Sequence, residues 1–597
     1  MTTSPDDPWP PGVPREPPPP PPPPVYQPRR AADPPVDRVE AEATALTARV
    51  ADRMADVGRN SAVQAAGTFA SRILGFVRTA LLVWCCGGMY LSYDSFTVAN
   101  TLPNQIFVLL GSGVLTAILI PQLTRAMHRD DGGQDYIDRL LTLALLGLVA
   151  VTAVCLAAVP ALTHFLVNTH TIQQGHVSAA SVAGYYRLTL LFCFWFMPQV
   201  LFYGVFAVLQ NVLNARGRFK AVAWAPAWAN LIQIASAVVF LAVWGSQSEP
   251  VLFSPGMIAV LGGGTTLGIA VQALCLIVPL RRDGFRFRMR FGWRGYGFGA
   301  VSRLVGWFLA TNAVSQVVGI YVSKMMVAVR GDLMGVAGPG SQANAFLLFM
   351  LPHSLITVSI ITSLYPLLAH AWQTDDRDRV RGLIRRFLTE PAVLVIPASA
   401  ALIALGSPII RTAFLSITRA EVGNVWLLLT VYAVGLVFFG VGNSAMRYYY
   451  ALEQGRTYFW FNALVPALQL VACWLALYAV RPAWGVAVIC GGSTLGWILQ
   501  ALLFMAVTRR QIGDYGLAGV LRLWARLAVA SAIAGGAGYA VVAVMDPLNG
   551  SRWFAPAILA ASGVMFGVVF WGAAAALRIT EFTTLMRHLS ARVLRRS

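Results

Sequence analysis

The sequence predicts an all-α integral membrane protein with about 14 transmembrane helices, arranged as two parallel-repeat lobes plus a C-terminal helix pair. Three observations predict this fold class. Of the 597 residues, 57% are hydrophobic and 12% are charged, the mean hydropathy is +0.63, and one motif recurs at long range. A spanning helix needs roughly 20 apolar residues, so neither a water-soluble enzyme nor a protein with one membrane anchor fits this composition.

The first 60 residues differ from the rest of the chain. Residues 17–24 are an unbroken run of prolines, a composition that forms polyproline II but cannot bury a core. In residues 36–57, apolar side chains recur at helical spacing among charged ones, which indicates a short amphipathic helix. We expect residues 1–60 to form a largely disordered cytoplasmic arm. Two roles stay open for this arm: a solvated spacer, or a segment that binds the membrane surface or a protein partner.

The basic residues of the loops predict the orientation in the membrane. Arg and Lys gather in alternate loops and at the end of the chain, in residues 125–129, 216–220, 281–294, 377–386, 509–510 and 587–596. The intervening loops of the first half lack both residue types, in residues 87–93, 167–181 and 245–255. Cytoplasmic loops carry the excess of Lys and Arg, so both termini are predicted to be cytoplasmic. Because the charge is spread over loops and forms no single stripe, no nucleic-acid partner is expected.

A six-residue motif repeats at a constant offset. Residues 263–268 read GGTTLG and residues 491–496 read GGSTLG, an offset of 228 (491 − 263). In each copy a Gln-Ala-Leu triplet and an Arg pair follow at the same spacing. Such an offset holds about six spans, an even number, so the two copies have the same orientation. This arrangement is typical of transporters, with the substrate path between the halves near the bilayer midplane.

The repeat gives a domain organisation. We expect an N-lobe at residues 61–290, a C-lobe at 291–515, a C-terminal helix pair at 516–580 and a basic cytoplasmic tail at 581–597.

The first span contains two arginines. Residues 71–78 read SRILGFVR, and a charge at a span centre costs roughly 2.5–3.5 kcal/mol unless it faces a cavity or a partner. Arg72 and Arg78 lie about 9 Å apart along the helix axis and roughly 120° around it. Gly75 removes bulk between them, and Ser71 shares a face with Arg78. Two guanidinium forks suit a phosphate or diphosphate; the alternative is that both side chains snorkel to the interface.

Two more charged residues lie in spans. Asp94 opens the second span, where the helix dipole favours a first-turn carboxylate; alternatively it is a counter-ion for an arginine, which a substrate phosphate displaces. Lys324 lies inside the seventh span, where it either adds a third positive charge to a cavity or snorkels to the outer surface.

Several catalytic signatures are missing from the sequence. It contains no Gly-rich nucleotide loop, no His-Glu-x-x-His and no nucleophile elbow. The seven cysteines lack metal-ligand spacing and are expected as small core residues. We therefore expect no enzymatic activity, no metal and no cofactor.

The motifs taken together resemble the MurJ (MviN) family of lipid II flippases, over about residues 61–580. The matching residues are Ser71 to Arg78, Asp94, Phe96, Leu102 to Asn104, Gly113, Pro121, Asn211 to Phe219, Ala225, Pro226, Asn230, Leu267, Gly268, Gln272, Ser315, Gln316, Leu351, Pro352 and Leu364 to Pro366.

The resemblance implies a fourteen-helix transporter of the multidrug/oligosaccharidyl-lipid/polysaccharide exporter superfamily. In this superfamily two lobes enclose a cavity, which is cationic in MurJ, and the last two MurJ helices add a groove for a lipid tail. Arg72, Arg78 and Asp94 match positions expected to bind or support the headgroup of a lipid-linked peptidoglycan precursor. Alternating access would move that precursor outward across a bacterial cell membrane. The sequence shows no sodium site, so the membrane potential is the expected driving force. Gly75, Pro103 and Pro352 are the expected structural hinges.

Some positions depart from the family pattern. Thr79 stands where the family commonly has an acidic residue, and Phe107, Val108 and Leu347 stand where it commonly has basic ones. The cavity is therefore less cationic than in the family, which makes Lys324 a candidate substitute.

The alternatives are a polysaccharide or drug exporter of the same superfamily, a membrane scaffold that recruits cell-wall synthesis proteins through the arm, and an integral glycosyltransferase. The expected partners are the lipid-linked precursor, membrane lipids and, through the arm, cell-wall synthesis proteins.

Overall fold

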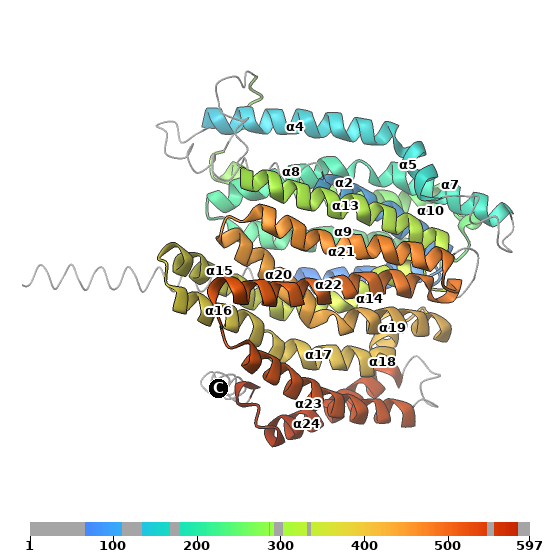
Figure 1. Cartoon of the computed structure of the whole chain (residues 1–597). Coiled ribbons are helices and arrows are strands. Elements are labelled where there is room, and N and C mark those ends of the chain that lie inside the picture. The colour runs from blue at the N-terminus through green and yellow to red at the C-terminus, as the bar shows by residue number, and fades with distance from the viewer. Residues whose placement is uncertain are drawn as a thin grey trace, which may run out of the picture. The chain divides into compact units, whose positions relative to one another are not determined.

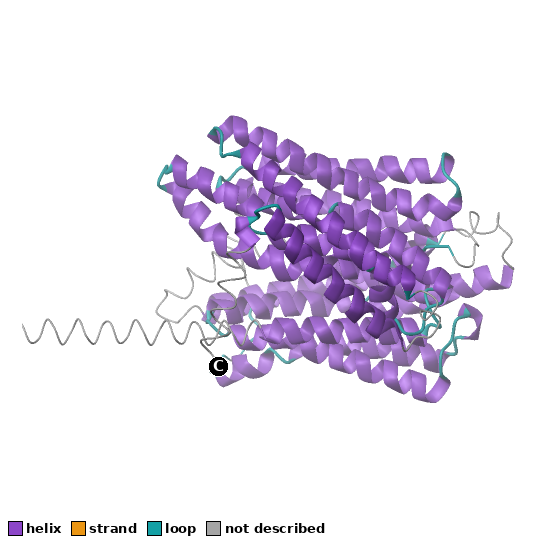
Figure 2. Ribbon diagram, turned by 90° about the horizontal axis from the view of Figure 1, so that it is seen from below, coloured by secondary structure: helices purple, strands orange, loops and turns teal. Residues whose placement is uncertain are grey.

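The computed structural model describes residues 66–109, 134–167, 179–285, 287–291, 303–330, 336–545 and 554–582. Within these ranges every regular element is a helix (Figures 1 and 2), which confirms the all-α fold class. The N-terminal arm expected at residues 1–60 lies outside the described residues, and so does almost all of the expected basic tail.

The described helices confirm a multi-pass membrane protein. Eleven of them are long and apolar enough to cross a membrane, or up to 13 spans are present if two bent helix pairs count as one span each. The second expected span begins with α2 (Leu91–Phe107), and its remainder falls in residues 110–133, outside the described part. The described residues therefore do not fix the total, and 14 stays a prediction.

The first half of the chain begins with the helix Ala66–Cys85 and α2. The helices that follow are α4 (Gln134–Ala157), α5 (Val159–Leu166), α7 (Ala179–Phe196), α8 (Gln199–Ala215), α9 (Phe219–Trp244), η2 (Pro250–Leu252), α10 (Pro255–Ile258), η3 (Ala259–Gly263), α11 (Gly264–Leu274) and α12 (Ile277–Arg282). The breaks have local causes. Pro198 precedes α8 and lacks the N–H that would continue α7, and η3 is a π-helical turn inside the span Pro255–Arg282.

The second half contains α13 (Arg303–Arg330), α14 (Pro339–Pro352), η4 (His353–Thr357), α15 (Val358–Gln373), α16 (Arg377–Thr389), α17 (Ala392–Ala404), α18 (Gly406–Ala413), α19 (Arg419–Val434), α20 (Leu436–Ala451), α21 (Gly455–Tyr478) and α22 (Pro482–Ile512). Pro352 ends α14, and the π-helical turn η4 follows at once. A capping box of Thr418 and Glu421 starts α19. The chain bends by 49° between α19 and α20.

The repeated motif makes equivalent contacts in both halves. In the first copy, a Cβ atom on Gly268 of α11 would lie 2.8 Å from the carbonyl of Ala229 on α9. In the second copy, a Cβ atom on Gly496 of α22 would lie 2.9 Å from the Cα atom of Val465 on α21. Each glycine therefore lets two helices approach closely. The repeat read from the sequence corresponds to two similar helix pairs, α9 with α11 and α21 with α22.

The last two spans form the expected C-terminal helix pair. α23 (Leu517–Val544) and α24 (Ala555–Ala576) pack on each other, on α17 and on α18, at the lower edge of Figure 1. Trp524 of α23 donates a hydrogen bond of 3.0 Å to the carbonyl of Leu388 on α16. The cysteines also behave as predicted, since six of the seven are buried and all seven are free thiols.

Candidate functional site

Ser71 fixes the arginine-bearing helix Ala66–Cys85 against α9. The side-chain amide of Asn230 donates a 2.9 Å hydrogen bond to the carbonyl of Ser71 and lies 3.5 Å from its hydroxyl. A Cβ atom on Gly75 would also meet the Asn230 amide, at 3.4 Å. Ser71 and Gly75, both predicted site residues, thus form the contact that orients the two arginines.

Arg78 lies in a polar niche of the first half. Its Nη1 donates to Oε1 of Gln233 at 3.2 Å, and Tyr203 and Tyr93 lie near its guanidinium. The Nε atom is buried without a hydrogen-bond partner. An orphaned buried donor costs about 1–3 kcal/mol, and such groups in native proteins are often functional.

Arg72 faces the second half of the chain. Its charge lies near His353, the first residue of η4, and no contact between the two side chains is needed for this placement. His353 is buried, its Nε2 lies 3.2 Å from the amide nitrogen of Asn443 on α20, and its ring packs on Phe439 at 4.6 Å. Its Nδ1 has no hydrogen-bond partner. One arginine therefore belongs to the first half, and the other lies where the halves meet.

A polar cavity of about 210 Å³ continues from Asn443 into the second half. Asn462 of α21 donates a 3.0 Å hydrogen bond to Ser315 of α13 at its wall, and Gln469 and Gln500 also line it. None of the described lining residues is charged. Neither His353 nor this cavity was predicted, because only charged residues in the spans were considered as site residues. The side-chain amides of Asn and Gln inside apolar helices could have indicated the cavity, because polar groups in a span usually face one another or a cavity.

Asp94 lies between α2 and the N-terminus of α14. The carboxylate is 1% exposed, and its Oδ1 accepts a 2.8 Å hydrogen bond from the backbone N–H of Gly340. The adjacent Tyr93 donates to Asn344 of the same helix at 3.1 Å. A carboxylate at a helix N-terminus is stabilised by the helix dipole. The structure therefore uses Asp94 to join the two halves.

A second carboxylate joins the same ends of the halves. Glu421 of α19, 4% exposed, accepts a hydrogen bond from the backbone N–H of Met89, in the turn before α2. Gly88 of that turn has φ +120°, and a Cβ atom there would lie 2.7 Å from Oε1 of Glu421. We call the contacts made by Asp94, Tyr93 and Glu421 the outer latch, because the loop charges of the sequence predict that these helix ends lie outside. Glu421 was not predicted as a site residue, because its capping-box position already accounts for a carboxylate there.

The remaining predicted residues lie as follows. Lys324 of α13 places its Nζ 4.1 Å from the ring centroid of Phe165 on α5, a cation–π contact between the two halves. Pro103 is buried inside α2. Pro352 lies directly before His353, so a predicted hinge position adjoins the residue that faces Arg72.

An all-helical fold of many spans with an internal repeat is the architecture of a membrane transporter. The chain is similar to a solved structure described as lipid II flippase MurJ in an inward closed conformation, with a TM-score of 0.63, 16% identity, and coverage of 86% of this chain and 98% of that one. It is also similar to an inward-facing multidrug resistance MATE transporter, with a TM-score of 0.54, 13% identity, and coverage of 74% and 95%.

The sequence comparisons define the family. The profile of the lipid II flippase MurJ family matches residues 88–559, and the chain belongs to this family. A probable lipid II flippase MurJ of Rhizobium meliloti (strain 1021) is 25% identical over 483 residues, 80% of this chain and 85% of the relative. Another, of Bdellovibrio bacteriovorus, is 25% identical over 469 residues, 76% of this chain and 82% of the relative.

Proposed function

We propose that this chain is a flippase for a lipid-linked peptidoglycan precursor, and that it carries the diphosphate headgroup across a bacterial plasma membrane by alternating access. Family membership supports the substrate class. The observation that carries the proposal in the structure is the arginine pair, with Arg78 in a niche of the first half and Arg72 opposite His353. Polysaccharide and drug exporters are less favoured, because two arginines repel cationic drugs and the family profile is that of lipid II flippases.

The outer latch supports a direction for the cycle. The loop charges put the start of α2 and of α14 on the outer side, where the bonds of Asp94 and Glu421 hold the halves together. Headgroup loading then takes place from the cytoplasmic side. Release requires that these bonds break and that the halves close on the inner side. Both termini are cytoplasmic in this scheme.

The headgroup would be held by charge and by hydrogen bonds. Guanidinium forks bind phosphate oxygens in a bidentate way, and Arg78 already has a buried donor without a partner. The remaining pyrophosphate oxygens would face Arg72 and the amides beyond His353. No covalent chemistry is needed, since a transporter only has to bind its substrate differently in its two states.

Complementation after depletion of the native protein tests the function. Variants Arg72→Ala and Arg78→Ala are expected to fail to restore lipid-linked precursor in the outer leaflet, while their membrane levels stay normal. Arg187→Ala is the matched control, since Arg187 is an exposed arginine in another span, on α7. Unchanged flipping after depletion would refute the proposal, and equal failure of all three variants would refute the arginine site.

A further inference from the structure

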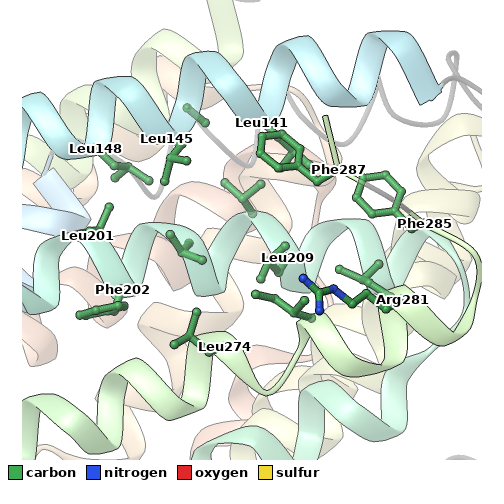
Figure 3. Close-up of a pocket in the computed structure, with 15 residues that line it drawn as sticks. Leu141, Leu145, Leu148, Leu201, Phe202, Leu209, Leu274, Arg281, Phe285 and Phe287 are labelled. Atoms are coloured by element: carbon green, nitrogen blue, oxygen red, sulfur yellow. The ribbon is translucent and has the colours of Figure 1, made fainter. Parts of the chain in front are cut away.

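A long apolar groove lies on the first half, apart from the residues of the arginine site. It has a volume of about 800 Å³ and is formed by α4, α8, α11 and α12 (Figure 3). Its walls are leucine, valine and phenylalanine side chains, among them Leu145, Leu148, Val205 and Leu209. The volume lies within the range of roughly 300–1,000 Å³ that is usual for small-molecule sites.

One end of the groove is charged. Arg281, on the last turn of α12, lines the groove, and Figure 3 shows its guanidinium reaching back among the apolar side chains toward Leu209. The side chain is exposed, and no described residue forms an ion pair or hydrogen bond with it. The next residue, Arg282, is exposed as well but does not line the groove.

The surroundings of Arg281 carry excess positive charge. Asp283 is the acidic residue closest to Arg281 in the sequence, and its charge is neutralised by Arg218 in an ion pair of 2.6 Å. Arg216 stacks on the ring of Phe285 at 5.1 Å, and this ring also lines the groove. Lys220, in the first turn of α9, is a further exposed cation. This end of the groove therefore suits an anion.

A short extended segment lies across the same end. Residues 287–291 are fixed to α4, because Arg288 N donates to Asp138 Oδ1 at 3.3 Å and Arg290 N donates to Thr142 Oγ1 at 3.1 Å. Phe287 of this segment lines the groove. The cytoplasmic orientation predicted for the loops at 216–220 and 281–294 places this end at the inner headgroup level.

We propose that the groove binds an anionic phospholipid of the cytoplasmic leaflet, with an acyl chain between α4, α8 and α11 and the phosphate on Arg281. Acyl chains gain little by leaving other acyl chains, because lipid tails are as apolar as leucine. Preference must therefore come from the headgroup. A charge-assisted hydrogen bond to a phosphate, together with the basic surroundings, favours an anionic headgroup over a zwitterionic one. This site is separate from the proposed precursor site.

Native mass spectrometry of the full-length protein in detergent tests the proposal. The probes are phosphatidylglycerol and phosphatidylcholine with identical acyl chains. We expect the protein to retain phosphatidylglycerol preferentially, and Arg281→Gln to lower its affinity about tenfold without changing that of phosphatidylcholine. Arg282→Gln is the matched control and is expected to bind both lipids as the native chain does.

A second pair of variants tests the apolar part. Leu145→Trp fills the groove and is expected to reduce retention of both lipids, whereas Leu146→Trp, on an exposed neighbour (38% exposed), leaves both unchanged. Equal losses in Arg281→Gln and Arg282→Gln would show diffuse surface attraction and overturn the proposal. So would phosphatidylglycerol retention that neither Arg281→Gln nor Leu145→Trp lowers, or a native chain without preference between the lipids. Lipid retention is measured without flipping, so the outcome is independent of the proposed function.

Discussion

The outer latch makes a quantitative prediction at Gly340. A Cβ atom there would overlap the ring of Tyr93 and lie 2.7 Å from Oδ1 of Asp94. Gly340→Ala must therefore push α14 away from α2 and lengthen the bond from its N–H to Asp94. A hydrogen bond to a charged group contributes about 1.5–3 kcal/mol. Since 1.36 kcal/mol corresponds to a factor of ten, the equilibrium should move toward separated outer ends by roughly 10- to 150-fold.

Pulsed electron–electron resonance on the protein in nanodiscs measures this shift. Spin labels at Val251 and Leu415 suit the experiment, because both side chains are 49% exposed and lie in the short connections between spans that the charge pattern predicts to be outside, Val251 in the turn η2. Gly340→Ala is expected to increase the long-distance population. Gly423→Ala on α19 is the control, since a Cβ atom there meets nothing within 4 Å. An unchanged distance distribution in Gly340→Ala, with the label pair responsive to substrate, would refute the latch.

Two further predictions concern single contacts, and a third concerns the N-terminal arm. Gly492→Val should lower the melting temperature in detergent, since a Cβ atom at Gly492 would lie 2.9 Å from the carbonyl of Leu468 and overpacking costs about 1–3 kcal/mol. Gly491→Val is the control and should leave the melting temperature unchanged, because a Cβ atom there meets nothing within 4 Å. Equal effects of the two variants would contradict the close contact between α21 and α22. Lys324→Gln and Phe165→Leu should be non-additive in a double-mutant cycle of thermal stability by about 0.5–2 kcal/mol; additive effects would exclude their cation–π contact. Deletion of residues 1–60 should preserve flipping in the complementation assay, whereas a scaffold that acts through the arm would lose function.

Features that repeat along the chain could be predicted from the sequence. The length of the apolar segments predicted the all-helical membrane fold. The offset of 228 residues between Gly263 and Gly491 predicted two equivalent sets of helices. Arg72 and Arg78 stood out because charges are rare inside spans. These signals are local, or periodic, and need no knowledge of how distant helices meet.

The contacts between distant helices could not be predicted in this way. Glu421 carries a capping-box pattern, and nothing near it in the sequence shows that it also accepts the N–H of Met89. For Asp94 the sequence left open a local role and a pairing with arginine, whereas the structure adds the N–H of Gly340 as its partner. A backbone donor leaves no residue-type signal. Such partners become visible only when the helices are packed.

The different surroundings of the two arginines bear on how substrate binding could drive the transport cycle. A ligand shifts a conformational equilibrium only by its differential affinity for the two states. Arg78 is bonded within the first half, to Gln233, so a phosphate on it alone stabilises both states alike. Arg72 lies near His353, which follows Pro352 in the second half, so a phosphate held there would respond to the separation of the halves. A diphosphate that engages both arginines would therefore use Arg78 for affinity and Arg72 for coupling. The headgroup itself would then link binding to the breaking of the outer latch.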